Sequence, residues 1–322
     1  MGTPASTPIP ELLLRWGPGM ASDMSLQGAQ DYCRTLTLGH GENFSVLTRL
    51  VPDRMREGMC AVYAFCRWAD DLGDEIGDPQ RSLELLSWWR GELQACYEGR
   101  SSHPVFIALA PVLEQHQLPI EPFEALIGAF EQDQTVSRYT HWDDLIAYCH
   151  GSADPVGRLV LALAGEHVTP EQLKASDAIC TALQLANHWQ DVKRDLLDRD
   201  RIYIPAELHT IPDFDDRLRS TVVNGHAPDR EFLALYRPLV KSCVERTWAL
   251  FQEGESLISS VSDDIKPVLW LFPAGGTAVL RLIEQWNYET CLGRPKVGLL
   301  TKIRLAIDAR RVARTYRASV ST

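Results

Sequence analysis

The chain has 322 residues, of which 45% are hydrophobic and 23% are charged, as expected of a globular protein with one large or two ordinary domains. Its net charge of −11 argues against nucleic-acid binding, which needs a basic surface, and against a polybasic grip on anionic lipid. The eight cysteines form no CxxC pair, so we expect reduced thiols in a cytoplasmic protein.

The opening stretch, MGTPASTPIPELLLRWGPGM, lacks the basic start and the long apolar core of a signal peptide or membrane anchor. We expect residues 1–24 to form a loose extension, with Met20 or Met24 as alternative natural starts. The stretch 267–280 is too short and too broken by Pro and Gly to span a bilayer. These features predict a soluble protein and leave room for a peripheral contact with the inner membrane.

Apolar residues recur at three- and four-residue spacing through most of the chain, which is the pattern of helices. The predicted helices cover 54–75, 81–98, 121–133, 143–163, 172–198, 230–259 and 277–290. Thr169-Pro170 is a good helix start, with Thr as the cap and Pro in the first turn. The segment 201–205, RIYIP, is the one hint of a strand, and 206–229 predicts a long connection or a weak helix. We therefore expect a single all-α domain of roughly ten helices over residues 25–322.

The segment 63–75, YAFCRWADDLGDE, places four carboxylates beside an apolar helical stripe. They are Asp70, Asp71, Asp74 and Glu75. Asp70 and Asp74 are one helical turn apart, and only Arg67 lies close enough on the same helix to neutralise them. Because an unpaired buried charge costs several kcal/mol, this cluster predicts a further cationic partner.

The segment 184–195, QLANHWQDVKRD, carries a second acidic cluster. Steps of three, four and four residues place its polar side chains on one ridge of an apolar helix. They are Gln184, Asn187, Asp191 and Asp195. Three other acidic doublets are typical of solvated faces or helix starts. They are Asp143-Asp144, Asp215-Asp216 and Asp263-Asp264.

Carboxylates that face one another across a helical cavity repel unless hard cations lie between them. Mg²⁺ prefers oxygen ligands and completes its shell with water and substrate phosphate. No ExxH motif of a di-iron bundle occurs, the histidines and cysteines are scattered, and no GxxxxGK[ST] phosphate loop is present. The sequence therefore predicts a magnesium–diphosphate site between two helices. Arg67 and Arg194 could bind the diphosphate there or could form only ion pairs within their helices.

At these residues the sequence resembles the head-to-head isoprenyl diphosphate synthases, which include squalene, phytoene and dehydrosqualene synthases. The similar segments, in the family's order, are 40–44, 63–74, 148–157, 184–195 and 201–205. Within the family the chain is most similar to the bacterial hydroxysqualene synthases of hopanoid biosynthesis, the HpnC type. The pointers are the residues at 42–44, 152–161 and 182–195. The resemblance implies an isoprenoid-synthase helical bundle around a central cavity.

The resemblance also implies roles for individual residues. The implied catalytic residues are Asp70, Asp74, Asp191, Asp195, Tyr63 and Tyr148. Those implied to bind the diphosphate and the prenyl chain are His40, Phe44, Arg67, Gln184, Asn187 and Arg194. About three Mg²⁺ ions would be held by Asp70, Asp71, Asp74, Asn187, Asp191 and Asp195. The aromatic faces of Phe44, Tyr63 and Tyr148 could stabilise a carbocation, with ordinary core packing as the alternative for each.

The implied reaction is ionisation of presqualene diphosphate and capture of water to give hydroxysqualene and diphosphate, with no NADPH. The absence of a basic residue at 42–44 favours this single large substrate over two molecules of farnesyl diphosphate. His40 or His188 could position the water, although a structural imidazole is the preferred interpretation of both. Asp154 receives no role. The alternatives are a presqualene diphosphate, squalene or phytoene synthase that condenses two prenyl diphosphates, or a non-catalytic bundle subunit of an isoprenoid pathway.

Overall fold

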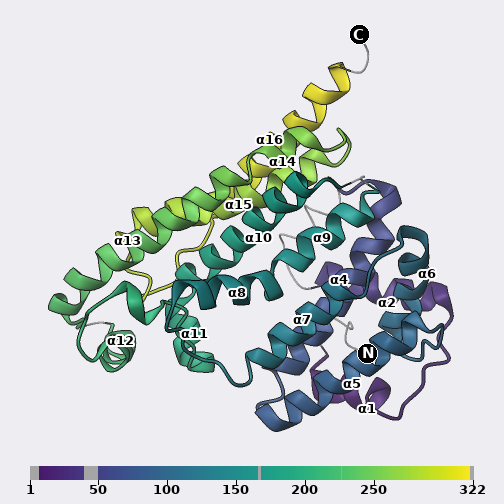
Figure 1. The fold of residues 1–322 in the computed structure, drawn as a ribbon, viewed down its shortest axis with the longest axis horizontal. Coiled ribbons are helices and arrows are strands. Elements are labelled where there is room, and N and C mark those ends of the chain that lie inside the picture. Colours follow the sequence, from purple (N-terminus) through teal and green to yellow (C-terminus); the bar gives the residue numbers. More distant parts are fainter. Residues whose placement is uncertain (1–6, 40–49, 166–167, 226, 320–322) are drawn as a thin grey trace. The chain divides into compact units, whose positions relative to one another are not determined.

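The computed structural model describes residues 7–39, 50–165, 168–225 and 227–319, and the regular structure within these ranges is helical (Figure 1). The predicted strand at 201–205 contributes only an isolated β-bridge, between Arg138 and Ile202. The all-α prediction is therefore confirmed. The chain divides into two compact units, unit 1 (1–135 and 155–168) and unit 2 (136–154 and 169–322).

The helices of unit 1 are the purple and blue elements of Figure 1. They are α1 (Ile9–Trp16), α2 (Leu26–Gly39), α4 (Asp53–Asp74), α5 (Pro79–Tyr97), α6 (Pro104–His116) and α7 (Glu121–Gln132). Most of α9 (Asp154–Leu163) also belongs to this unit. The long helix α4 contacts α2, α5, α6 and α7, so the first acidic cluster lies at the end of the best-packed helix of the unit.

The expected loose extension at 1–24 is wrong over α1. Ile9, Leu12 and Trp16 are buried, and the Trp16 ring meets the edge of Tyr32 at a centroid distance of 4.8 Å. An eight-residue helix is too short to show a convincing helical repeat in the sequence, and its stability comes from these tertiary contacts. The segment is thus part of the core of unit 1.

Aromatic rings fix the orientation of α4. Trp68 stacks on Trp89 of α5 at 5.4 Å between centroids, and its indole N–H donates to the Tyr32 hydroxyl over 2.9 Å. His103 lies edge-on to Trp68 at 4.4 Å. These contacts set which side chains of the last turns of α4 point into the core and which point away from it.

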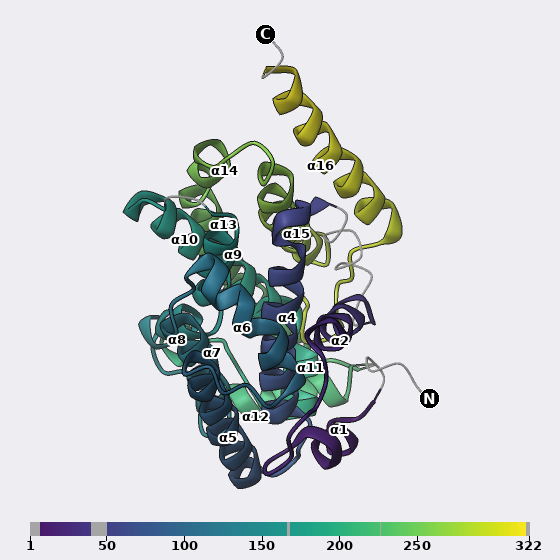
Figure 2. The ribbon, with the colours of Figure 1, turned by 90° about the vertical axis from the view of Figure 1, so that its right-hand side faces the viewer.

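Unit 2 comprises the teal, green and yellow elements that follow residue 135. They are α8 (Trp142–Ser152), α10 (Pro170–Gln190), α11 (Val192–Arg199), a 3₁₀ turn η2 (Ala206–Leu208), α12 (Phe214–Val223), α13 (Arg230–Glu253), α14 (Ser256–Ser260), α15 (Lys266–Gln285) and α16 (Leu299–Ser319). Figure 2 shows α16 as a separate yellow helix beside α15.

The helix α10 is the centre of unit 2 and contacts α8, α13, α14 and α15. Its predicted start is confirmed, because Thr169 and Gln172 form a capping box. The Trp189 indole N–H donates to the Thr247 hydroxyl of α13 over 2.8 Å. On α15, a Cβ at Gly276 would lie 2.5 Å from the Phe251 ring, so only glycine permits this approach of α13 and α15.

Several predicted helix boundaries differ from the structure. The predicted helices 143–163 and 172–198 each divide, at Ala153 and at Asp191. The predicted helix 230–259 ends as α13 at Glu253 and is followed by α14, and α15 covers Lys266–Gln285 instead of 277–290. Helices α2, α6 and α16 were not predicted, whereas α12 (Phe214–Val223) lies in 206–229 and matches the weak helix that was one of the two alternatives there. Across the described ranges, no helix is both long enough and apolar enough to cross a membrane.

Candidate functional site

The first acidic cluster occupies the last turn of α4 in unit 1. Arg67 donates to Asp70 over 2.9 Å and to Glu75 over 3.0 Å, and it also pairs with Asp71. Asp74 is the last helical residue. The ion pairs within the helix that the sequence left as an alternative for Arg67 are therefore present. One guanidinium serves three carboxylates, and Asp74 adds a fourth negative charge.

The charge of this cluster is not balanced on α4. Burial raises the pKa of Asp71, and the neighbouring Glu75 and Asp70 raise it further, while Arg67 lowers it. The helix dipole adds a partial negative charge at the same end of α4. Both observations show that the cluster would gain from a further cation.

The second acidic cluster lies at the junction of α10 and α11 in unit 2. The predicted single helix stops at Asp191, yet the amide of Asp191 donates to the Asn187 carbonyl and the amide of Asp195 to the Asp191 carbonyl, over 2.9 and 2.8 Å. The four-residue spacing of Asn187, Asp191 and Asp195 is therefore kept across the boundary between α10 and α11. Asp191 and Asp195 are buried, whereas Gln184 is half-buried and Asn187 is exposed.

Two arginines hold Asp191, which is 3% exposed. Arg194 donates to its Oδ2 over 2.7 Å, one turn along the helix. Arg294, from the loop between α15 and α16, donates to both carboxylate oxygens, with its Nη2 3.1 Å from Oδ2. A bidentate guanidinium pair of this kind is among the strongest side-chain contacts in proteins.

Sequence reasoning missed Arg294. It treated the segment 293–298, GRPKVG, only as a helix breaker, and no periodicity links Arg294 to an aspartate 103 positions earlier. The same loop is fixed to the helix junction at two more points, since the Gln190 side chain donates to the Pro295 carbonyl and Lys193 donates to the Leu292 carbonyl. The loop is thus part of the site.

Asp195 is the less compensated carboxylate of the second cluster. Arg194 lies 3.5 Å from its Oδ1, which is longer than the contact that Arg194 makes with Asp191. Burial raises the pKa of Asp195 to about 6, Asp191 raises it further, and Arg194 opposes the shift. This buried carboxylate would also be stabilised by an added cation.

An aromatic cluster lies beside the second acidic cluster in unit 2. Tyr148 is buried, with its ring 5.7 Å from Tyr139 and 6.0 Å from Tyr203 between centroids. His188 stacks on Tyr203 at 3.6 Å, and burial lowers its pKa to about 3. His188 is thus a neutral imidazole packed among aromatic rings, which agrees with the structural role preferred for it in the sequence analysis.

The remaining predicted residues are placed as follows. Tyr63 is half-buried on α4, one turn before Arg67. His40 and Phe44 lie outside the described residues, and so does the predicted substrate motif at 40–44. In the described ranges no three His, Cys, Asp or Glu side chains converge into a ready-made metal site.

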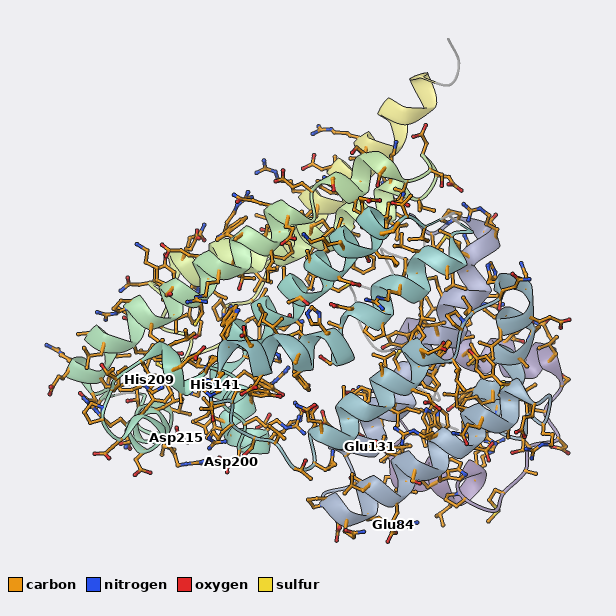
Figure 3. The ribbon with its side chains drawn as sticks, viewed as in Figure 1. Glu84, Glu131, His141, Asp200, His209 and Asp215 are labelled. Atoms are coloured by element: carbon orange, nitrogen blue, oxygen red, sulfur yellow. The ribbon has the colours of Figure 1, made fainter. Side chains whose placement is uncertain are left out.

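The three other acidic doublets have structural roles, as predicted. Asp144 completes a capping box at the start of α8, and Asp263 pairs with Lys266 at 2.6 Å. Asp215 is bound by Arg138 at 2.6 Å on the surface of unit 2 (Figure 3). Each of these doublets therefore has a local structural partner.

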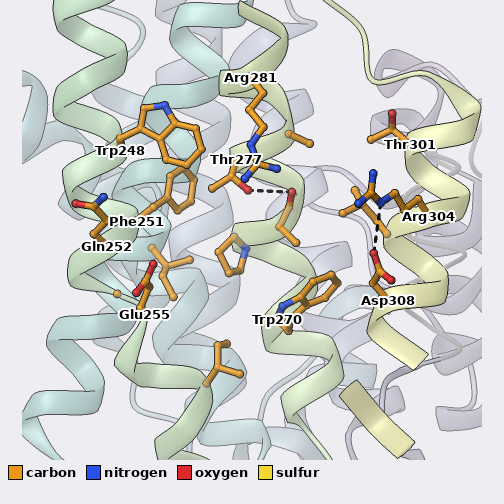
Figure 4. A pocket seen from close by; sticks show the side chains of 17 residues that line it. Trp248, Phe251, Gln252, Glu255, Trp270, Thr277, Arg281, Thr301, Arg304 and Asp308 are labelled. Carbon is orange, nitrogen blue, oxygen red and sulfur yellow. Dashed lines mark hydrogen bonds and ion pairs between the residues drawn. The ribbon is translucent and has the colours of Figure 1, made fainter. Parts of the chain in front are cut away.

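Unit 2 also holds a cavity of about 670 Å³ between α13, α15 and α16 (Figure 4). Its labelled lining includes Trp248, Trp270, Arg281 and Arg304, and none of the predicted site residues. This cavity is therefore separate from the acidic clusters.

The donor set of the two clusters fits magnesium. It consists of carboxylate oxygens, with an amide oxygen at Asn187, and it contains excess negative charge at Asp71 and Asp195. The nearby Arg67, Arg194 and Arg294 supply the fixed positive charge that a diphosphate would need.

The family model for squalene/phytoene synthases matches residues 37–301, which is most of the chain and includes both acidic clusters. The chain belongs to the squalene/phytoene synthase family. Among curated relatives, a hydroxysqualene synthase of Rhodopseudomonas palustris is 33% identical over 229 residues, which are 69% of this chain and 72% of the relative. A 15-cis-phytoene synthase of Synechococcus elongatus is 27% identical over 87% of this chain and 91% of its own length.

Solved structures of the squalene/phytoene synthase family share the fold. A structure described as squalene synthase HpnC from Alicyclobacillus acidocaldarius matches with a TM-score of 0.72 and 37% identity, over 89% of this chain and 99% of the other. A dehydrosqualene synthase matches with a TM-score of 0.73 at 22% identity, which shows the fold alone. The resemblance seen in the sequence is confirmed at the level of the family.

Asp154, which receives no role in the sequence analysis, is a buried carboxylate in the structure. It is 1% exposed, accepts a hydrogen bond from the Thr181 hydroxyl over 2.9 Å and bonds to His150 Nδ1. Burial raises the pKa of Asp154, although His150 and Thr181 oppose the shift. A buried carboxylate therefore lies at the start of α9 with only neutral or exposed partners.

We predict that Arg294→Gln lowers the free energy of unfolding by about 1–2 kcal/mol, because Asp191 stays buried with Arg194 as its one remaining arginine. The measurement is urea unfolding followed by circular dichroism. Lys296→Gln, an exposed substitution in the same loop, is the matched control and should change stability by less than about 0.5 kcal/mol. Equal effects of the two substitutions would contradict the assigned pair.

We predict that Asp154→Asn becomes increasingly stabilising, relative to the unchanged chain, as the pH rises above the ordinary aspartate pKa of 3.8. The raised pKa means that the folded state binds the proton more tightly than the unfolded chain, so ionisation costs stability as the pH rises. Asparagine keeps an acceptor for the Thr181 hydroxyl and a polar group beside the His150 ring. Thermal unfolding between pH 4 and pH 8 should show the widening difference, and Asp198→Asn, at an exposed site, should not.

Proposed function

We propose that this protein ionises presqualene diphosphate with the help of magnesium and captures water to form hydroxysqualene and diphosphate. The observation that carries the proposal is the 37% identity over 89% of the chain to the squalene synthase HpnC structure, in a chain that keeps both acidic clusters. The similarity to hydroxysqualene synthases at 33% identity points the same way. The family supports a prenyl diphosphate substrate and a divalent metal in general terms.

In this proposal about three magnesium ions would be held by Asp70, Asp71 and Asp74 of the first cluster and by Asn187, Asp191 and Asp195 of the second. When bound, magnesium supplies Lewis-acid stabilisation of the charge that develops on the departing diphosphate. Arg67 and Arg194 then exchange part of their pairing with carboxylates for pairing with phosphate oxygens, since a guanidinium binds either anion bidentately. Gln184 would donate its amide protons to the same oxygens, and His40 and Phe44 keep the substrate-binding role that the family resemblance implies.

The proposed reaction breaks the carbon–oxygen bond to the diphosphate and leaves a cyclopropylcarbinyl cation. The oxygen of water forms the new bond as the ring opens, and the water loses its proton. No hydride is transferred and no net oxidation or reduction occurs, so no NADPH is needed. Tyr63 and Tyr148 are proposed to stabilise the cation with their ring faces, each contributing roughly 0.5–2 kcal/mol if desolvated.

The experiment incubates the purified protein and Mg²⁺ with presqualene diphosphate, with and without NADPH, and identifies products by mass spectrometry. Hydroxysqualene in both reactions is the expected result. Squalene that appears only with NADPH would assign the reductive enzyme instead. Release of diphosphate from farnesyl diphosphate alone would assign a condensing synthase of the presqualene or phytoene type.

We expect Asp70→Asn and Asp191→Asn each to lower the rate of product formation by about a hundredfold or more, because each removes a carboxylate from the metal site. Asp143→Asn, in a surface doublet, is the matched control and should keep the rate. Unchanged rates in both site variants would contradict the site. A folded protein that turns over none of the substrates would instead be the non-catalytic bundle subunit.

A further inference from the structure

The last helix of unit 2, α16, leaves an apolar face uncovered. Leu300 is 83% exposed, and Ile303 and Ile307 are 47% and 45% exposed. Their spacing of three and four residues places them on one face of the helix. Leu299, at 69% exposure, adjoins that face. Large apolar side chains grouped in this way usually mark a contact surface.

The opposite face of α16 is the one that packs against unit 2. Thr301, Leu305 and Asp308 line the cavity that α16 shares with α13 and α15 (Figure 4 shows Thr301 and Asp308), and Ala309 is fully buried. The exposed apolar residues therefore do not pack against α15, which contacts the other side of α16.

The charge of α16 differs in sign from that of the whole chain. Residues 299–319 contain six basic residues and one acidic residue, a net charge of +5, within a protein of net charge −11. The rest of the chain thus carries −16. The negative net charge of the whole chain argued against binding to anionic lipid, but α16 taken alone is strongly basic.

The basic residues lie where the exposed apolar face ends. Arg310 is exposed and follows Ile307 by three residues, so it continues the same face toward the C-terminal end. Arg311 is 73% exposed and pairs with Asp308 at 2.9 Å. A helix with large apolar residues on one face and arginines beside them is typical of segments that lie in a membrane interface.

We propose that α16 docks this protein on the surface of a bilayer that contains anionic lipids. The four apolar side chains enter the boundary between headgroups and acyl chains, and the arginines meet the anionic headgroups. A second copy of the chain fits the surface less well, because two copies of α16 placed face to face would bring two charges of +5 together. The inference deepens the proposed function, whose substrate and product are lipids.

The test is flotation of the full-length protein with vesicles of phosphatidylcholine that contain about one quarter phosphatidylglycerol, in low salt and without substrate. We expect co-flotation with these vesicles, little with pure phosphatidylcholine, and loss of binding in high salt. Ile303→Gln combined with Ile307→Gln, and separately Arg310→Gln combined with Arg311→Gln, should each weaken binding at least about tenfold. The thermal midpoints of both variants should stay unchanged because the sites are exposed.

The matched control removes two exposed cations from α13 of the same unit, as Arg230→Gln with Lys241→Gln, and should bind like the unchanged protein. Equal weakening by the control, or no binding to anionic vesicles, would overturn the proposal. A dimer in solution that Ile303→Gln and Ile307→Gln convert to a monomer, with no vesicle binding, would assign the face to a second copy. Vesicle binding is measured without turnover, so its failure leaves the proposed reaction untouched, and the reverse also holds.

Discussion

The constraint on which the site depends is the cost of burying carboxylates without enough positive charge. On α4 one guanidinium serves three carboxylates, and the pKa of Asp71 is raised. At the α10–α11 junction two arginines hold Asp191, while Asp195 keeps a raised pKa. Each cluster retains negative charge that a divalent cation would relieve.

Arg67, Arg194 and Arg294 neutralise part of the charge, and each is suited to release a carboxylate and bind phosphate in its place. The exchange changes only the anion that each guanidinium faces. The crowded carboxylates lower the stability of the fold, which is a common cost of a functional site.

The sequence predicted what local periodicity and short spacing can encode. The all-α class, the two acidic ridges and the cap at Thr169 follow from patterns within one helix, and the structure confirms them. Arg294 could not be found in this way, because its pairing with Asp191 depends on how the loop after α15 returns to α10. The α1 helix was missed for a similar reason, since Trp16 is held by tertiary contacts with Tyr32. The basic charge of α16 was missed because the acidic residues elsewhere outweigh it in the net charge of the whole chain.

The central claim, as proposed above, is that both acidic clusters take part in binding a metal–diphosphate group. Isothermal titration with inorganic pyrophosphate in excess Mg²⁺ tests it directly, using Asp74→Asn, Asp195→Asn and the double variant. The account predicts that each single substitution weakens pyrophosphate binding at least about tenfold, and that the double variant is weakened by much less than the product of the two effects. Purely multiplicative effects, or full affinity in either single variant, would contradict it.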